Sequence, residues 1–232
     1  MKNVLVDYRI TETEEINLYK LGYHSIKVPP SKVLYKAVSG HPDMLLHKIT
    51  NEEILVHKDM PKNFINTLIS FNYKVMTTHK GLCDSYPNDI LLNAVNLDTL
   101  FMHNLKYTDP VLLKAVRGKK QINVKQGYTK CSTAIINNNA VITSDICISK
   151  ALKHEGVDVL LLPPKDILLE GLDYGFIGGS CGLLDEGTLA FYGNLQKYKY
   201  GNEVLNFLLK HDVKPVYLSD ENLIDRGTII SI

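Results

Sequence analysis

Two aspartates and one cysteine begin three similar apolar segments, and together these side chains could modify a cationic substrate. Asp43 opens Asp-Met-Leu-Leu, Asp89 opens Asp-Ile-Leu-Leu, and Cys131 opens Cys-Ser-Thr-Ala-Ile-Ile. Each lies 14–16 residues before the polar residue that ends the next apolar segment, so we predict that the three occupy equivalent positions in repeated units. The carboxylates would bind a cation such as guanidinium. A thiolate would attack its carbon, provided that a nearby cation lowers the pKa of the thiol.

Cys131 is the preferred nucleophile, and His41 is the preferred general acid and base. His41 stands two residues before Asp43 in His-Pro-Asp. The ordinary pKa of histidine, near neutrality, suits proton transfer. Each residue also has a structural alternative: Cys131 as an inert buried thiol, and His-Pro-Asp as a turn or a helix cap. The residues alone leave these alternatives open.

Cys181 is the second candidate nucleophile, in the run Gly178-Gly-Ser-Cys-Gly182. Glycines let a backbone approach a ligand closely, so their amides and Ser180 could bind substrate or an oxyanion. The alternative is a β-bulge or tight packing between repeats. The four cysteines include no Cys-x-x-Cys pair and no histidine at zinc-finger distance. We therefore expect free thiols, no metal site and no organic cofactor.

Asn88, Asn93 and Arg226 are weaker candidates for the site. Arg226 could hold a substrate carboxylate through its two parallel N–H donors. It could equally pair with Asp225 or Glu221 at the surface, where such ion pairs contribute little stability.

The candidate residues lie on a repeated pattern. Asp43, Asp89, Cys131 and Gly178 are separated by 46, 42 and 47 residues, and such a period indicates repeated structural units. Each unit has the pattern strand, strand, helix, strand. The first repeat is expected to have strands 43–49 and 53–58, helix 62–71 and strand 73–77, and the second strands 89–95 and 99–103, helix 109–117 and strand 121–125. The third is expected to have strands 132–137 and 140–144, helix 146–155 and strand 157–162, and the fourth strands 175–184 and 188–193, helix 202–211 and strand 214–218.

The two ends of the chain supply a fifth unit. Strand 4–6, helix 11–21 and strand 24–28 lack a first strand, which segment 227–232 can provide. Pairing these ends closes a ring and leaves no exposed sheet edge there. We predict an α/β fold: a five-fold pseudosymmetric ring of ββαβ repeats, forming one domain over residues 1–232 with a polar cavity at its centre. An open α/β sheet is the alternative.

The composition predicts a globular protein without a nucleic-acid or membrane partner. The formal net charge of the 232 residues is +1, and no apolar run approaches the ~18 residues of a spanning helix. The widely spaced cysteines favour free thiols in a reducing compartment, so we expect a cytoplasmic location. We also expect a small-molecule substrate and allow for a homodimer.

A five-fold ring of ββαβ units resembles the pentein fold, which is shared by arginine and agmatine deiminases, dimethylarginine dimethylaminohydrolases and amidinotransferases. The resemblance covers the whole chain. It is nearest to an uncharacterised bacterial group that carries Gly40-His-Pro-Asp43, Gln126-Gly-Tyr-Thr-Lys-Cys-Ser132 and Gly175-Phe-Ile-Gly-Gly179. It implies a cysteine nucleophile, a histidine acid and base, and acidic residues around a guanidinium. His41-Pro-Asp43 resembles the His-x-Asp element of the deiminases. The known hydrolases have their cysteine near the C-terminus, an order that favours Cys181.

Two functions follow from these residues and this resemblance. The first is a cysteine-dependent hydrolase or transferase that acts on a guanidine- or amidine-type C–N bond of a small cationic substrate. The second is a non-catalytic pentein that binds a small ligand or a ribosome-type partner, because a fold does not determine chemistry. An enzyme is expected to have one cysteine that is hyper-reactive at neutral pH, whereas a binding protein is expected to have four ordinary ones.

Overall fold

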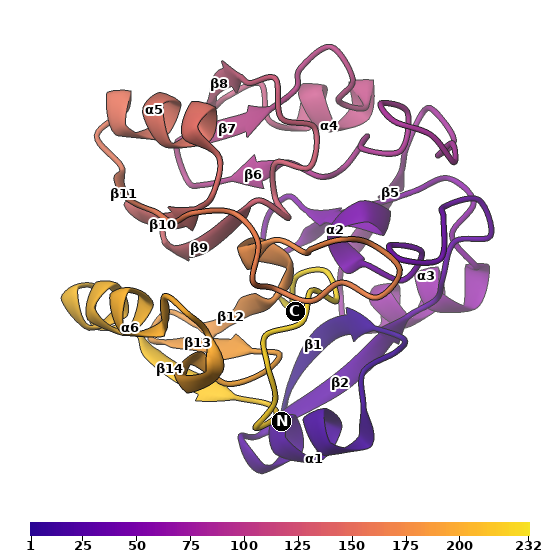
Figure 1. Ribbon diagram of the computed structural model, residues 1–232. Coiled ribbons are helices and arrows are strands. Elements are labelled where there is room, and N and C mark those ends of the chain that lie inside the picture. Colours follow the sequence, from indigo (N-terminus) through magenta and orange to yellow (C-terminus); the bar gives the residue numbers. More distant parts are fainter.

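Five small β-sheets lie around a common centre in the computed structural model, which describes residues 1–232 (Figure 1). In every sheet the first strand pairs antiparallel with the second, and the second pairs parallel with the third. A helix connects the second strand to the third. The predicted ring of five ββαβ units is therefore confirmed.

All elements of the ring are short. The first unit has β15 (Ile230–Ser231), β1 (Lys2–Asp7), α1 (Glu12–Lys20) and β2 (Tyr23–Val28), and the second has α2 (Pro42–Leu45), β3 (Leu46–Lys48), β4 (Glu53–Val56), α3 (Lys62–Ser70) and β5 (Lys74–Thr77). The third unit has β6 (Val95–Asn96), β7 (Leu100–His103), α4 (Pro110–Ala115) and β8 (Lys120–Asn123), and the fourth has β9 (Thr133–Asn137), β10 (Ala140–Thr143), α5 (Ile146–His154) and β11 (Asp158–Leu161). The fifth unit has η1 (Ile177–Gly179), β12 (Cys181–Asp185), β13 (Thr188–Phe191), η2 (Leu195–Lys197), α6 (Gly201–Lys210) and β14 (Lys214–Tyr217).

The two ends of the chain close the ring by pairing with each other. β15 runs antiparallel to β1, with Val4 opposite Ser231 and Leu5 opposite Ile230. The same sheet continues with the parallel pair of β1 and β2. The segment at the end of the chain is thereby the first strand of the first unit, as the repeat pattern predicted.

The helices begin and end where local side-chain chemistry favours it. Thr11 and Glu14 form a capping box at the start of α1, because each side chain bonds the backbone N–H of the other residue. Asp145 caps α5 by accepting from the N–H groups of Cys147 and Ile148. Gly156, at φ +81°, follows α5 in a conformation that favours glycine.

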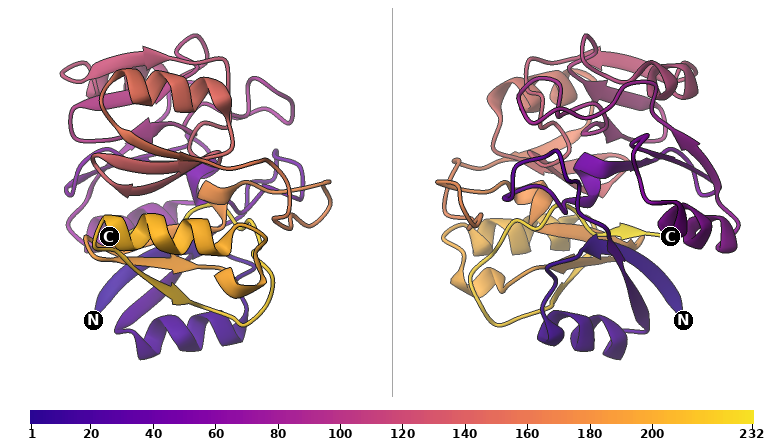
Figure 2. Two further views of the ribbon diagram at one scale, coloured as in Figure 1. Left: turned by 60° about the vertical axis from the view of Figure 1, so that its left-hand side comes forward. Right: turned by 90° about the vertical axis from the view of Figure 1, so that its right-hand side faces the viewer.

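The sheets are arranged with their first strands inward and their helices outward (Figures 1 and 2). The first strand of the last sheet, β12, contacts β9 and β15, the first strands of the two neighbouring units. The apolar faces of the helices cover the sheets; Leu68 of α3, Leu152 of α5 and Leu208 of α6 are fully buried. No helix of the structure has the length and apolar character needed to cross a membrane.

The first strands of three units differ from their predicted bounds. The predicted strand 43–49 is the short helix α2 followed by β3, and most of the predicted strand 89–95 is a turn that leads into β6. The predicted strand 175–184 begins only at β12, after the short helix η1. Pro42 occupies a first helical position, where proline is favourable, and short apolar runs do not distinguish a strand from other buried segments. The irregular turns before the first strands carry the candidate side chains to the centre of the ring.

Candidate active site

The thiol of Cys131 lies at the centre of the ring and contacts two side chains from other units. Its Sγ donates to Asp43 Oδ2 at 3.1 Å and accepts from Asn93 Nδ2 at 3.0 Å. Asn93 Oδ1 accepts from the backbone N–H groups of Lys130 and Cys131, so Asn93 holds the turn that carries the thiol. All three side chains are buried. The turns before β3, β6 and β9 thus meet at one point.

His41 lies beside this thiol and faces the carboxylate of Asp225. The distance from His41 Nδ1 to Asp225 Oδ1 is 3.7 Å, and neither nitrogen of the buried imidazole has a hydrogen-bond partner. One polar atom from each of His41, Asp43 and Cys131 lies within 4.8 Å of the others. A nucleophile, an adjacent base and a third group that faces the base are the parts from which nucleophilic sites are built.

Asp225 is held by several hydrogen bonds, although sequence analysis assigned it no functional role. Its carboxylate accepts from the N–H groups of Phe176 at 2.8 Å and Gly227 at 3.0 Å. A Cβ at residue 179 would lie 1.9 Å from Asp225 Oδ1. Gly227 has φ +67°, and a Cβ there would lie 2.6 Å from His41 Cβ. Glycine is required at both positions because the carboxylate and the imidazole occupy the space of a side chain.

A cavity of about 250 Å³, which we call the Cys131 cavity, opens onto these groups. Aromatic and apolar side chains form most of its wall, and the residues that line it are Tyr35, Val38, His41, Tyr128, Cys131, Leu169, Leu172, Asp173, Tyr174, Phe176 and Asp225. Asp89 lies behind this wall, where its Oδ2 accepts from the Tyr128 hydroxyl at 2.6 Å. A mostly apolar cavity with a few convergent polar groups is typical of small-molecule sites.

The charges around Cys131 keep its thiol protonated in this state. Burial raises the pKa of Cys131 well above its ordinary value, and the carboxylates of Asp43 and Asp225 raise it further. Burial also raises the pKa of Asp225, which His41 opposes, and the pKa of Asp89, which the hydrogen bond from Tyr128 opposes. A reactive thiolate requires a nearby cation that lowers this pKa, either a protonated histidine or the bound substrate. In the ligand-free site the neighbouring carboxylates raise the pKa instead, and the adjacent His41 faces one of them.

His41, Asp43 and Cys131 are also the residues of the chain that could hold a metal ion. Nitrogen, oxygen and thiolate sulfur are all ligands that zinc accepts, and three protein ligands leave one coordination position for a substrate. The absence of a resident metal remains a prediction from the sequence.

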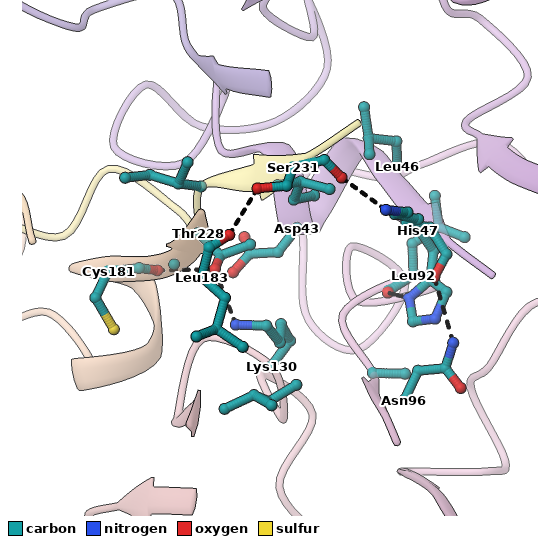
Figure 3. A pocket seen from close by; sticks show the side chains of 16 residues that line it. Asp43, Leu46, His47, Leu92, Asn96, Lys130, Cys181, Leu183, Thr228 and Ser231 are labelled. Atoms are coloured by element: carbon teal, nitrogen blue, oxygen red, sulfur yellow. Dashed lines mark hydrogen bonds between the residues drawn. The ribbon is translucent and has the colours of Figure 1, made fainter. Parts of the chain in front are cut away.

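Cys181 lies apart from this constellation, in a second cavity of about 270 Å³ that we call the Cys181 cavity (Figure 3). Its Sγ donates to the carbonyl of Ile177 at 3.2 Å, and burial raises its pKa to about 12. Lys130 Nζ donates to Thr228 Oγ1 in the same cavity, and Lys48 Nζ donates to the carbonyl of Ser231. No residue lines both cavities; Asp43 lines one and Cys131 the other, so their hydrogen bond lies in the wall between them.

The glycine run around Cys181 has a packing role. The N–H of Gly179 donates to the carbonyls of Cys131 and Phe176, so it is not free for an oxyanion. A Cβ at residue 178 would lie 2.3 Å from the carbonyl oxygen of Lys130. The Ser180 hydroxyl donates to the carbonyl of Ile177 and lines neither cavity. Tight packing between repeats, which was the alternative from the sequence, therefore accounts for this segment.

The remaining candidates from the sequence lie outside the Cys131 cavity. Asn88 is exposed in the loop before the third unit. Arg226 bonds Glu14 Oε1 at 3.2 Å and the carbonyl of Arg9, so it pairs with neither of the partners considered for it.

The predicted equivalence of the two aspartates and the cysteine is wrong in its register. Asp43 lies three residues before β3 and Cys131 two residues before β9, whereas Asp89 lies six residues before β6. They still gather near one cavity, because the turns before the first strands differ in length.

Solved structures that match this fold include amidinotransferases, DDAH and agmatine deiminase. An amidinotransferase of the saxitoxin biosynthetic pathway of Microseira wollei matches with a TM-score of 0.57 and 11% identity, over 94% of this chain and 88% of that one. A cysteine-to-serine mutant of DDAH from Pseudomonas aeruginosa, complexed with citrulline, matches with a TM-score of 0.56 and 12% identity, over 94% and 93%. A cysteine-to-serine mutant of agmatine deiminase from C. jejuni, with substrate bound, matches with a TM-score of 0.53 and 12% identity, over 94% and 87%.

The closed ring of five units, its central polar site and these matches define the chain as a pentein by fold. Within that fold it belongs to a family of unknown function (DUF6873), whose model matches residues 5–230. No curated protein matches the sequence.

Proposed function

We propose that the protein is a cysteine-dependent hydrolase or transferase that cleaves a guanidine- or amidine-type C–N bond of a small cationic substrate. The observation that carries this proposal is the position of Cys131 at the wall of a cavity, with Asp43, His41 and Asp225 around its sulfur. Its structural neighbours modify guanidino groups, and two of them were solved as cysteine-to-serine mutants with citrulline or a substrate bound.

The substrate itself supplies the cation that activates the thiol. A guanidinium in the cavity places positive charge against Asp225 in the wall and near Asp43 behind it, the two carboxylates that raise the pKa of Cys131. Neutralising them removes the repulsion that opposes the thiolate, so the pKa of Cys131 falls when the substrate binds. The thiol is thereby protonated at rest and reactive only in the complex.

His41 moves the protons of both half-reactions. It accepts the proton of Cys131 as the thiolate adds to the guanidinium carbon and forms a C–S bond. It then donates that proton to the departing amine nitrogen as the C–N bond breaks, which leaves a thiouronium on Cys131. Water, or an acceptor amine in a transferase, adds to the same carbon and gives its proton to His41. The C–S bond breaks, and Cys131 regains a proton.

The test compares the two buried cysteines. Cys131→Ala removes the proposed nucleophile, and we expect a loss of at least about 10⁴-fold in turnover of a guanidine panel, followed as urea, citrulline or ammonia release. Cys181→Ala is the matched control, and its activity is expected to stay within a few-fold of the wild type. Full activity in both variants excludes the mechanism. Binding of guanidines without turnover by the wild-type protein supports the non-catalytic alternative.

A further inference from the structure

The wall of the Cys131 cavity carries negative charge and no positive charge other than that of a protonated His41. Of its 11 residues none is lysine or arginine, whereas Asp225 lies at its inner end and Asp173 is exposed in the loop that forms one side. Asp43 and Asp89 lie directly behind the wall, each with one buried carboxylate oxygen that has no partner.

Two cations near this cavity already have partners. Arg9 donates to Asp7 and to the carbonyls of Lys36 and Ala37. The Lys130 ammonium points into the Cys181 cavity, where it donates to Thr228. A ligand in the Cys131 cavity therefore meets no lysine or arginine side chain in its wall.

This charge distribution distinguishes among guanidines. A ligand carboxylate that enters the cavity loses water, has no cation to pair with and is repelled by Asp173 and Asp225. Its burial there therefore costs free energy. An ammonium or alkyl group at the same place is favoured by Asp173 and by the walls of Tyr35, Tyr174 and Phe176, since aromatic rings attract cations and bury apolar chains.

We propose that the Cys131 cavity selects guanidines without a carboxylate, and that Asp173 favours those with a second positive charge at the far end of an alkyl chain. This inference rests on the proposed function for the position of the guanidinium, next to Cys131. The preference for a second positive charge comes from Asp173, which takes no part in the chemistry.

Agmatine and L-arginine provide the test, because they differ only by one carboxylate. Binding of both to the Cys131→Ser protein is measured by titration calorimetry, in which turnover cannot interfere. We expect agmatine to bind at least about tenfold more tightly, which corresponds to about 1.4 kcal/mol. Equal binding, or tighter binding of L-arginine, overturns the inference.

A charge reversal at Asp173 identifies the residue responsible. In Asp173→Lys, combined with Cys131→Ser, agmatine should bind at least about fivefold more weakly and L-arginine more tightly, while butylguanidine, which has no second charge, should be unaffected. Unchanged selectivity overturns the role of Asp173. Selective binding in the absence of turnover by the wild-type protein overturns the proposed function and leaves this inference standing. Failure of all three guanidines to bind overturns both.

Discussion

The Cys131 and Cys181 cavities are similar in size and each contains a buried cysteine, yet their charges have opposite signs. The Cys131 cavity has Asp225 and Asp173 in its wall and no lysine or arginine, and Asp43 accepts a hydrogen bond from its thiol. The Cys181 cavity contains Lys48 and Lys130 as well as Asp43, and the two ammonium groups donate to carbonyls and a hydroxyl rather than to that carboxylate. Burial of a cysteine is thus common to both cavities, and the surrounding charge determines which of them suits a cationic ligand.

The two thiols also differ in how a ligand could change them. Burial is the largest cause of the raised pKa of Cys131, and the carboxylates of Asp43 and Asp225 raise it further, so a bound cation can lower it again. Burial is also the largest cause of the raised pKa of Cys181, but Lys130 lowers this pKa and Asp225 is the only carboxylate that raises it. Cys131 therefore has more neighbouring negative charge for a cationic substrate to neutralise.

The largest expected effect comes from the two buried histidines that precede and follow α2. His41 lines the Cys131 cavity, and His47 lines the Cys181 cavity. His41→Asn removes the proposed general acid and base, so we expect turnover to fall by about 10²–10⁴-fold. His47→Asn is the matched control, because burial lowers the pKa of His47 to about 4 and its Nδ1 bonds the carbonyl of Leu92. Its turnover should stay within a few-fold of the wild type.

Separate measurement of kcat and KM sharpens the histidine comparison. His41→Asn should lower kcat, whereas His47→Asn should retain the wild-type values. Equal losses in the two variants contradict the assignment, because they would show that both histidines act through folding. Thermal unfolding of both proteins shows whether either change disturbs the ring.

A smaller effect is expected on the reactivity of the thiols in the absence of substrate. Asp43→Asn removes a negative charge beside Cys131, so the pKa of this thiol falls and its alkylation by iodoacetamide at pH 8 accelerates, by roughly tenfold for each unit of the fall. Lys130→Met removes the cation near Cys181 and should slow the alkylation of Cys181. The rates are obtained by mass spectrometry of each cysteine peptide. A Cys131 rate that does not change in Asp43→Asn contradicts the electrostatic account.

The architecture was predictable from the sequence because it depends on patterns that recur locally. Each unit repeats turn residues, apolar alternation and helix caps such as Asp145 at fixed intervals, and the incomplete units at the two ends complement each other. The first strands were the part that failed. Segment 89–95 is an apolar run whose burial, rather than strand pairing, explains its composition, since only Val95 and Asn96 form a strand.

The site was predictable in part. The proximity of Cys131, His41 and Asp43 could be predicted from the repeat pattern and the His-Pro-Asp motif. Asp225, which faces His41, was considered only as a surface partner of Arg226. Its role depends on contacts with His41 and Phe176, which are far away in the sequence. Gly175, Gly179 and Gly227 are the available signal, because each leaves space that Asp225 or His41 fills.

The smallest expected effect is the stability cost of the negative charge around the Cys131 cavity. Burial raises the pKa of Asp89 above its value in the unfolded chain, which is about 3.9. The contribution of Asp89 to stability is therefore fully present below about pH 4 and is lost as the pH rises through the folded-state pKa.

Asp89→Asn removes this pH-dependent loss of stability and keeps an oxygen for the hydrogen bond from Tyr128. We expect its melting temperature to exceed that of the wild type by a few degrees at pH 7.5 and to match it near pH 3.5. Asp84→Asn, at an exposed position, is the control and should show no such difference. A destabilised Asp89→Asn protein at pH 7.5 would mean that the carboxylate is compensated by groups other than Tyr128, and the Cys131 cavity would then be less negative than the comparison with the Cys181 cavity requires.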